Sequence, residues 1–325
     1  MPPYIPPLLL PLSLPPSTYC QSYFILLASG CLALQLLPAL QDVLLNYGPR
    51  NSSPAAKPAP REPETADNTR DALLRPLVVL LRRTGLLTRV PHAWFSHFYL
   101  ALLVFQIFWA AQYLTGGRVL SAIAGMEMES GKGEGGGMSL GQVVLAWGML
   151  TAQAARRLYE CWFVMRPSAS QMLGLHWVLS VLVYLAMSVS VWIEGSAAIL
   201  GVTSAEEGNT ISPLRTAVAA GIFIVASAQQ HRAHKHLASL RKYTLPYDGL
   251  FRYIVCAHYT CECLIYVALA GAAAPRGHLL NRTLLSGLFF VAANLGATAK
   301  NTKVWYVEKF GAERVQRWRM IPFLF

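Results

Sequence analysis

The sequence predicts an all-α membrane protein, a polytopic bundle of about seven transmembrane helices. Hydrophobic residues make up 54% of the 325 residues and charged residues only 13%. The apolar residues gather in long runs, and the charged residues fall in the gaps between these runs. Because a soluble domain typically carries about 25% charged residues, this distribution favours helices that cross a bilayer.

The candidate spans have close to the ~20 residues that cross the hydrocarbon core of a bilayer. In chain order they cover residues 19–45, 95–115, 139–160, 171–193, 212–229, 251–274 and 279–299. Residues 1–18 form a Pro-rich leader that we expect to be irregular. Residues 19–90 hold the first span and a polar loop, of which the Pro- and Ala-rich part 51–71 is predicted to be disordered.

The charges in the gaps predict an orientation. Gaps rich in Lys and Arg follow the first, third, fifth and seventh spans, and they alternate with gaps that carry fewer basic residues. The positive-inside rule then places the N-terminus in the lumen and the C-terminus in the cytosol, which requires an odd number of spans. The net charge of +11 is explained by this topology, with anionic lipid or an anionic cofactor as partner, so no nucleic-acid partner is expected.

Neither a disulfide scaffold nor a metal site is predicted. The six cysteines form no C-x-x-C pair. His231, His234 and His236 form a His-rich tract of the kind that binds metals, but the neighbouring Arg232 and Lys235 would repel a cation.

Ionisable residues in or beside the spans are the candidates for chemistry, because each is costly in a membrane unless paired or hydrated. His97 and Tyr99 open the second span, where they either face a cavity as proton donors or belong to an interfacial aromatic belt. Gln153, Arg157 and Glu160 share one helical face at the end of the third span. Their alternative interpretation is an Arg–Glu pair that ties helices together.

The C-terminal third holds the remaining candidates. His258 and Glu262 are four residues apart and therefore lie on one face of the sixth span. The basic residues near 231–242, followed by a Pro-Tyr-Asp-Gly turn, suit an anionic ligand at the membrane face. The chain ends in five apolar residues, 321–325, which predicts a C-terminus folded back onto the bundle.

Two segments, LASLRKYTLPYDGLFRYIVCAHYTCECLIY and WYVEKFGAERVQRWRMIPFLF, resemble the C-terminal domain of steroid 5α-reductases. These endoplasmic reticulum membrane enzymes use NADPH to reduce a double bond conjugated to a carbonyl. The segments QAARRLYECWFV and VPHAWFSHFY resemble the polyprenol (polyprenal) reductase branch of that family. The resemblance implies substrate-side helices over residues 91–210 and an NADPH-binding membrane domain over residues 211–325.

The resemblance also implies site residues. The NADPH-binding positions of the family fall on Gln230, Arg241, Tyr243, His258, Glu262 and Tyr306. Where the family usually has a His shortly before the Trp/Phe-Tyr pair, this chain has Thr302 and Lys303, and Lys303 is a candidate for the phosphates of the cofactor. Ala154 stands where the steroid branch has its substrate-binding Tyr, so the substrate-end roles are assigned to His97, Tyr99, Arg157 and Glu160.

The expected function is NADPH-dependent reduction of the α-isoprene double bond of polyprenal or polyprenol, in dolichol synthesis for protein N-glycosylation. The aldehyde is the expected substrate, because its carbonyl makes the β-carbon electrophilic. A long-chain isoprenoid and membrane lipid are the expected partners, with no obligate protein partner. The alternatives are a steroid 5α-reductase, a trans-2-enoyl-CoA reductase and, from another class, a seven-span receptor or transporter with a polar pathway at its midplane.

Overall fold

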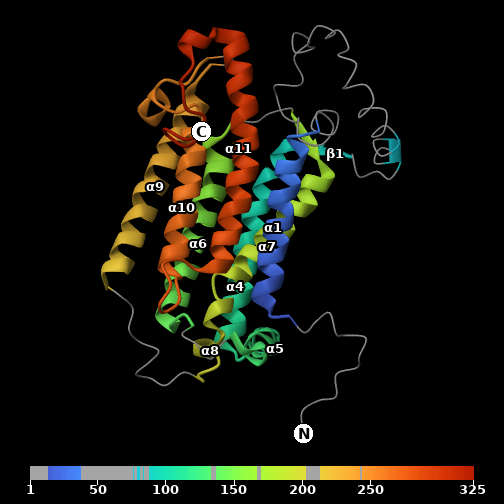
Figure 1. Cartoon of the computed structure of the whole chain (residues 1–325), viewed down its shortest axis with the longest axis vertical. Coiled ribbons are helices and arrows are strands. Elements are labelled where there is room, and N and C mark those ends of the chain that lie inside the picture. The colour runs from blue at the N-terminus through green and yellow to red at the C-terminus, as the bar shows by residue number, and fades with distance from the viewer. Residues whose placement is uncertain are drawn as a thin grey trace.

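The computed structural model describes residues 14–37, 88–132, 137–166, 170–202, 213–241 and 244–325, with residues 76, 79, 80 and 83. It shows an elongated bundle of helices that run along its long axis (Figure 1). The loop at 51–71, predicted to be disordered, lies outside the described residues.

Seven helices of 16 to 29 residues build the bundle, and each overlaps one of the predicted spans. They are α1 (Pro16–Leu34), α4 (Ser96–Leu114), α6 (Leu140–Tyr159), α7 (Gly174–Ser190), α9 (Pro213–Ser239), α10 (Ala257–Ala272) and α11 (Arg282–Phe310). Among the described residues, three helical segments are long and apolar enough to cross a membrane: His92–Leu114, Gly174–Ile199 and Arg282–Phe310. The chain is therefore an all-α membrane protein.

Short elements connect these helices. A two-stranded antiparallel sheet pairs β1 (Arg89–Pro91) with β2 (Gln171–Leu173) and so joins the starts of α4 and α7. The region between the second and third predicted spans carries an additional helix, α5 (Arg118–Glu127), and α8 (Ser196–Ile199) follows α7. Helix α6 continues into a π-helical turn, η5 (Glu160–Val164), and a 3₁₀ turn, η7 (Gly249–Arg252), precedes α10.

Several boundaries differ from the sequence-based expectation, among them those of α1, α10 and α11. Helix α1 begins at Pro16, inside the leader predicted to be irregular, because proline lacks an N–H and its fixed φ suits the first helical turn. Helix α10 begins at Ala257 and not at 251, because the backbone N–H groups of Val255 and Cys256 donate to the tail instead. Helix α11 runs to Phe310, well beyond residue 299.

The C-terminal tail folds back onto the bundle, as the sequence predicts. Gly311 ends α11 with φ 87°, a conformation that favours glycine. The tail then pairs beside Ile254, where Val255 N–H and Cys256 N–H each donate over 2.9 Å to the carbonyls of Trp318 and Arg319. We call the end of the bundle where this tail lies the tail end (Figure 1).

The core is apolar and closely packed. Helices α9 and α10 lie side by side, as do α1 and α11, and α4 packs on both α6 and α7. Trp109 of α4 and Trp192 after α7 meet with their ring centroids 5.1 Å apart. At Gly287 of α11 a Cβ atom would lie 2.6 Å from the end of the buried Met187 side chain, which would have to shift to make room for it.

Candidate active site

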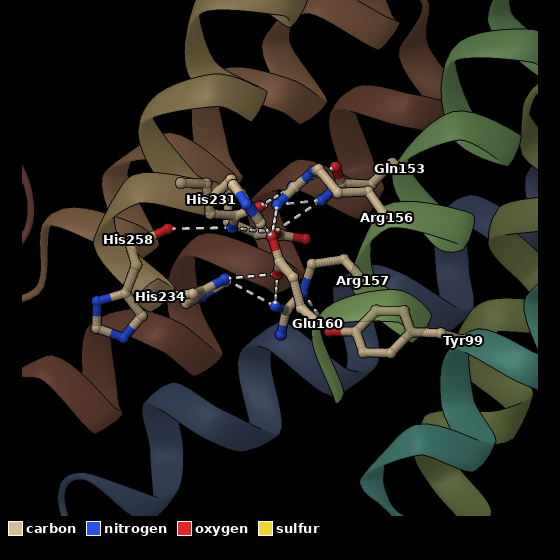
Figure 2. Close-up of polar contacts among 10 residues, drawn as sticks. Tyr99, Gln153, Arg156, Arg157, Glu160, His231, His234 and His258 are labelled. Atoms are coloured by element: carbon tan, nitrogen blue, oxygen red, sulfur yellow. Dashed lines mark hydrogen bonds and ion pairs between the residues drawn. The ribbon is translucent and has the colours of Figure 1, made fainter. Parts of the chain in front are cut away.

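Glu160, where α6 passes into η5, is the centre of a buried cluster of charged and polar side chains (Figure 2). Its side chain is fully buried. One carboxylate oxygen contacts Arg156 and, over 2.8 Å, His231 Nδ1. The other contacts Arg157 and, over 2.7 Å, His234 Nδ1. A carboxylate buried in an apolar bundle is tolerated only with such charged and hydrogen-bonding partners.

His234 completes this cluster from the part of α9 that lies beyond the predicted span 212–229. Its Nδ1 also lies 2.8 Å from Arg157, so the two contacts of this nitrogen belong to different tautomers. With a proton on Nδ1 the ring donates to Glu160, and without one it accepts from Arg157. Burial and then the charge of Arg157 lower the pKa of His234 to about 4, so the ring is neutral at pH 7.

Tyr99 of α4 joins the cluster through Arg157. The guanidinium Nε donates to the Tyr99 hydroxyl over 3.1 Å, and its carbon lies 4.9 Å from the centroid of the same ring. The rings of Phe95 and Tyr184 each pack against Tyr99 with centroids 5.6 Å apart. Because arginine only donates, the hydroxyl oxygen of Tyr99 is the acceptor and its proton is not used in this bond, while the Tyr184 hydroxyl also interacts with Tyr99.

A second carboxylate, Glu262 of α10, lies beside the first. It accepts hydrogen bonds from Gln153 Nε2 over 3.1 Å and from Gln230 Nε2. Arg156 connects the two groups, because it contacts Glu160 and also donates to the side-chain oxygens of Gln153, over 2.7 Å, and Gln230. Helices α6, α9 and α10 therefore meet in one polar network, which α4 extends through Tyr99.

Comparison with known proteins relates the C-terminal part of the chain to a family. Residues 176–325, which include Gln230 and Glu262, match the family model described as 3-oxo-5-alpha-steroid 4-dehydrogenase. This part of the chain, from α7 to the tail, is thus similar to the steroid 5α-reductase family. The two segments that resemble this family, one leading into α10 and one in the tail, lie within the matched range.

The curated relatives of this chain are named polyprenal reductase, the branch that QAARRLYECWFV and VPHAWFSHFY resemble. A Saccharomyces cerevisiae polyprenal reductase is 31% identical over 181 residues, which cover 55% of this chain and 64% of the relative. A Drosophila melanogaster polyprenal reductase is 27% identical over 258 residues, 72% of this chain and 76% of the relative. An Arabidopsis thaliana polyprenal reductase 1 is 31% identical over 115 residues, 33% of this chain and 35% of the relative. The match thus covers just under two thirds of the yeast relative's length.

Six of the candidate residues predicted from the sequence come together in the network. They are Tyr99, Arg157, Glu160, Gln230, His258 and Glu262. The backbone carbonyl of His258 accepts from Gln230 Nε2 over 3.2 Å. The ring of His258 packs on Tyr259 and, with centroids 5.6 Å apart, on His234.

The other candidate residues lie elsewhere. His97 packs between Trp94 and Trp177, with centroid distances of 5.3 and 6.2 Å. Arg241 is exposed just beyond the end of α9. Lys303 donates to the backbone carbonyl of Arg317 over 2.6 Å.

Two of the predicted cofactor residues remain. Tyr306 is buried in a separate hydrophobic cluster that Tyr259 and Cys263 flank. Tyr243 lies outside the described residues.

Four residues of the network are absent from the site predicted from the sequence: Arg156, His231, His234 and Gln153. The sequence places Gln153 only on the face of Arg157 and Glu160, and it suggests the histidines only as metal ligands. In the structure both histidines contact Glu160. Within the described residues, no group of three or more His, Cys, Asp or Glu side chains is arranged to hold a metal ion. The helical periodicity of α9 is the signal that groups His231 and His234, three residues apart, with Gln230.

A cavity of about 600 Å³ lies between α9 and the turn that follows it. Its lining includes Arg232, Lys235 and His236 of α9 and Asp248 and Gly249 of the turn. On α9 these residues lie beside Gln230, His231 and His234, which join the buried network. Two cationic side chains at its wall suit a phosphate group.

Proposed function

We propose that this chain is a polyprenal reductase that uses NADPH to reduce the α-isoprene double bond of its substrate, in dolichol synthesis for protein N-glycosylation. The observation that carries the proposal is the hydrogen bond from Arg157 to Tyr99. It presents a hydroxyl group within electrostatic reach of Glu262, which lies in the region that matches the reductase family. The substrate class follows from the curated relatives, which are polyprenal reductases.

The residues present fit a nicotinamide dinucleotide. Glu262 and the amide groups of Gln153 and Gln230 form a set of donors and acceptors that can bind a carboxamide or ribose hydroxyl. Arg232 and Lys235 line the neighbouring cavity and can bind phosphates. Arg241, Tyr243, Lys303 and Tyr306 stay in the proposal on the family resemblance alone. When bound, NADPH supplies a hydride.

The substrate-side residues polarise the carbonyl in this proposal. An isolated alkene does not accept a hydride, whereas an α,β-unsaturated aldehyde does, because its carbonyl withdraws electrons from the β-carbon. Tyr99 donates its proton into a hydrogen bond with the aldehyde oxygen, where negative charge develops. Arg157 stabilises that charge through its bond to the Tyr99 oxygen, and Glu160 holds Arg157 in place. The enolate of the substrate then takes a proton from water at its α-carbon, which completes the reduction of the double bond.

The bundle suits a substrate that is carried by the membrane. We propose that the seven long helices all span the endoplasmic reticulum membrane, with the tail end and the cofactor on the cytosolic side. Four of these helices, α1, α6, α9 and α10, are not among the three clearest spans. Helices α6, α9 and α10 carry polar residues of the network, and α1 packs on α11. An isoprenoid chain then reaches Tyr99 from the lipid phase, while the cofactor binds from water.

Purified protein with NADPH, offered polyprenal and polyprenol in parallel, tests the proposal. We expect turnover of polyprenal to dolichal and none of polyprenol in the absence of an oxidant. Reduction of polyprenol alone would contradict the aldehyde mechanism. A 3-oxo-Δ4 steroid and a trans-2-enoyl-CoA belong in the same assay, because preferential turnover of either one would assign this chain to a different substrate class.

A further inference from the structure

The C-terminal tail carries two arginines and several apolar side chains that the reductase mechanism does not use. Arg317 and Arg319 lie close enough to Lys303 of α11 for their charges to act on its ammonium group. None of the three is in a salt bridge with an acidic residue among the described parts of the chain. The two guanidinium groups rest instead on aromatic rings, 4.9 Å above Trp318 and 4.7 Å above Phe325.

Large apolar side chains are exposed beside these cations. Phe323 and Leu324 each keep 82% of their surface accessible, although they belong to a tail whose backbone is hydrogen-bonded. The backbone carbonyl of Phe325 accepts from the N–H groups of Arg319, Met320 and Ile321, and this closes the turn. The side chains point outward although burial would have stabilised them.

The backbone of this tip is strained. Phe323 has φ 66°, a left-handed conformation that is rare for residues other than glycine and unfavourable for a bulky one. Strain of this kind persists where the surroundings enforce it, and it is concentrated at functional positions. The strained turn presents Phe323 and Leu324 next to Arg317 and Arg319.

The position of the tail along the bundle agrees with the level of lipid headgroups. A helix crosses the hydrocarbon core in about 20 residues, so α11, which starts at Arg282, leaves the core near residue 301. Lys303 follows directly. The tail pairs beside Ile254, just before α10 begins, and the nearby Tyr253 is 67% exposed. Exposed aromatic side chains of this kind gather at membrane interfaces.

We infer that the tail binds the headgroup of an anionic phospholipid, with Arg317 and Arg319 on the phosphate and Phe323 and Leu324 in the adjoining acyl region. Clustered cations attract anionic lipid, and apolar neighbours anchor them at the interface. The phosphates of NADPH share this chemistry, but exposed apolar side chains match a lipid and not a soluble dinucleotide. The lipid phosphate is therefore the ligand that this surface fits.

Lipid binding to the full chain tests the inference without any measurement of activity. The purified protein in neutral detergent is titrated with dioleoylphosphatidylserine and, separately, with dioleoylphosphatidylcholine, and bound lipid is counted by native mass spectrometry. We expect the wild-type protein to prefer the serine lipid about tenfold or more. Equal affinity for the two lipids would overturn the inference, and this comparison needs no variant.

Substitutions then locate the binding surface. The double variant Arg317→Gln and Arg319→Gln is expected to lose about 25-fold in affinity for the anionic lipid, about fivefold per charge. The matched control, Arg118→Gln with Arg282→Gln, removes two exposed cations from other helix starts and should bind like the wild type. If both double variants bind the serine lipid equally, the tail is not the site.

Two further measurements distinguish lipid binding from a purely structural tail and from cofactor binding. Phe323→Gly removes the backbone strain, so we expect an equal or higher melting temperature together with weaker lipid binding. A purely structural tail would show the change in melting temperature without the change in lipid binding.

NADPH binding to the Arg317→Gln and Arg319→Gln variant is measured in the absence of anionic lipid. An unchanged dissociation constant supports the inference, and a strongly raised one with unchanged lipid binding overturns it in favour of the cofactor.

Discussion

The two ends of the bundle use carboxylates in different ways. Away from the tail end, Glu127 accepts from the backbone N–H of Ser17 over 2.8 Å and from its hydroxyl over 2.6 Å. Glu194 accepts in the same manner from the N–H of Thr283 over 2.9 Å and from its hydroxyl over 2.6 Å. Both carboxylates thus cap the first turn of a helix, α1 or α11, where the helix dipole favours negative charge.

At the tail end, the carboxylates of Glu160 and Glu262 are bound by side chains from other helices. Their partners are arginine, histidine and glutamine groups, each able to rotate and to exchange one partner for another. Backbone N–H groups at the start of a helix cannot move in this way. The comparison separates carboxylates that fix the fold from carboxylates that can bind a ligand.

The largest effect is expected for Glu160→Gln. The change leaves Arg156 and Arg157 buried without an anionic partner, and breaking a buried pair costs about 3–5 kcal/mol. Reductase activity is expected to fall by about a thousandfold, because Arg157 no longer holds Tyr99. The check is kcat for polyprenal together with the melting temperature in detergent. Activity near the wild-type level would remove Glu160 from the site.

Tyr99→Phe is expected to lower kcat by about a hundredfold, since the ring stays in place while the proton donor is lost. Tyr113→Phe on the same helix, where the side chain is exposed, serves as the control and should keep full activity. Steady-state kinetics with polyprenal compare kcat of Tyr99→Phe with kcat of Tyr113→Phe. A kcat equal to that of the control would mean that another group polarises the carbonyl.

Glu262→Gln is expected to raise the KM for NADPH by about tenfold, with a smaller change in kcat, because the cofactor loses a charged hydrogen-bond acceptor. Glu308→Gln, an exposed change on α11, is the matched control. An unaltered KM for NADPH would show that Glu262 supports only the fold of the network.

Acid should destabilise the tail end through His234. Burial, and then the charge of Arg157, lower the pKa of this histidine to about 4, whereas the unfolded chain keeps a value near 6.5. Between these values the unfolded chain binds the extra proton. Stability is therefore complete above pH 6.5 and falls by up to about 3 kcal/mol as the pH drops to 4.

Melting temperatures between pH 7 and pH 4 measure this loss. His234→Gln should flatten the profile, and His278→Gln, at an exposed histidine, should leave it as in the wild type. Parallel profiles for all three proteins would refute the assignment of the acid sensitivity to His234.

The smallest effect on catalysis is expected for Glu127→Gln, at the end of the bundle away from the tail. Glu127→Gln weakens the hydrogen bonds to Ser17 and should lower the unfolding free energy by about 1–2 kcal/mol. Both kcat and the KM for NADPH should stay unchanged. A cofactor defect in this variant would break the distinction between the two ends of the bundle.

Local sequence patterns predicted the helices and one face of the site. Long apolar runs marked the seven long helices, and the spacing of Gln153, Arg157 and Glu160 placed them on one side of α6. The first inference depends only on residues within one span, and the second only on residues within two turns of one helix. The spacing in the sixth span indicated Glu262, and the family resemblance added Gln230, which the structure joins to Glu262 by a hydrogen bond.

The contacts between distant segments could not be predicted in this way. His231 and His234 reach Glu160 across 71 and 74 residues of sequence, so no local pattern reports the pairing. The cations Arg232 and Lys235 argued against metal binding, and in the structure they line a separate cavity. A contact between distant segments also sets the start of α10. Val255 and Cys256 precede the helix because their N–H groups donate to the tail.

The transfer of a labelled hydride tests the central claim most directly. Purified wild-type protein is given polyprenal and NADPH that carries deuterium at C4 of the nicotinamide, and the product is analysed by mass spectrometry. The account predicts dolichal with one deuterium at the β-carbon, and about a hundredfold slower label transfer in Tyr99→Phe. A product labelled at the aldehyde carbon, with the double bond intact, would contradict it.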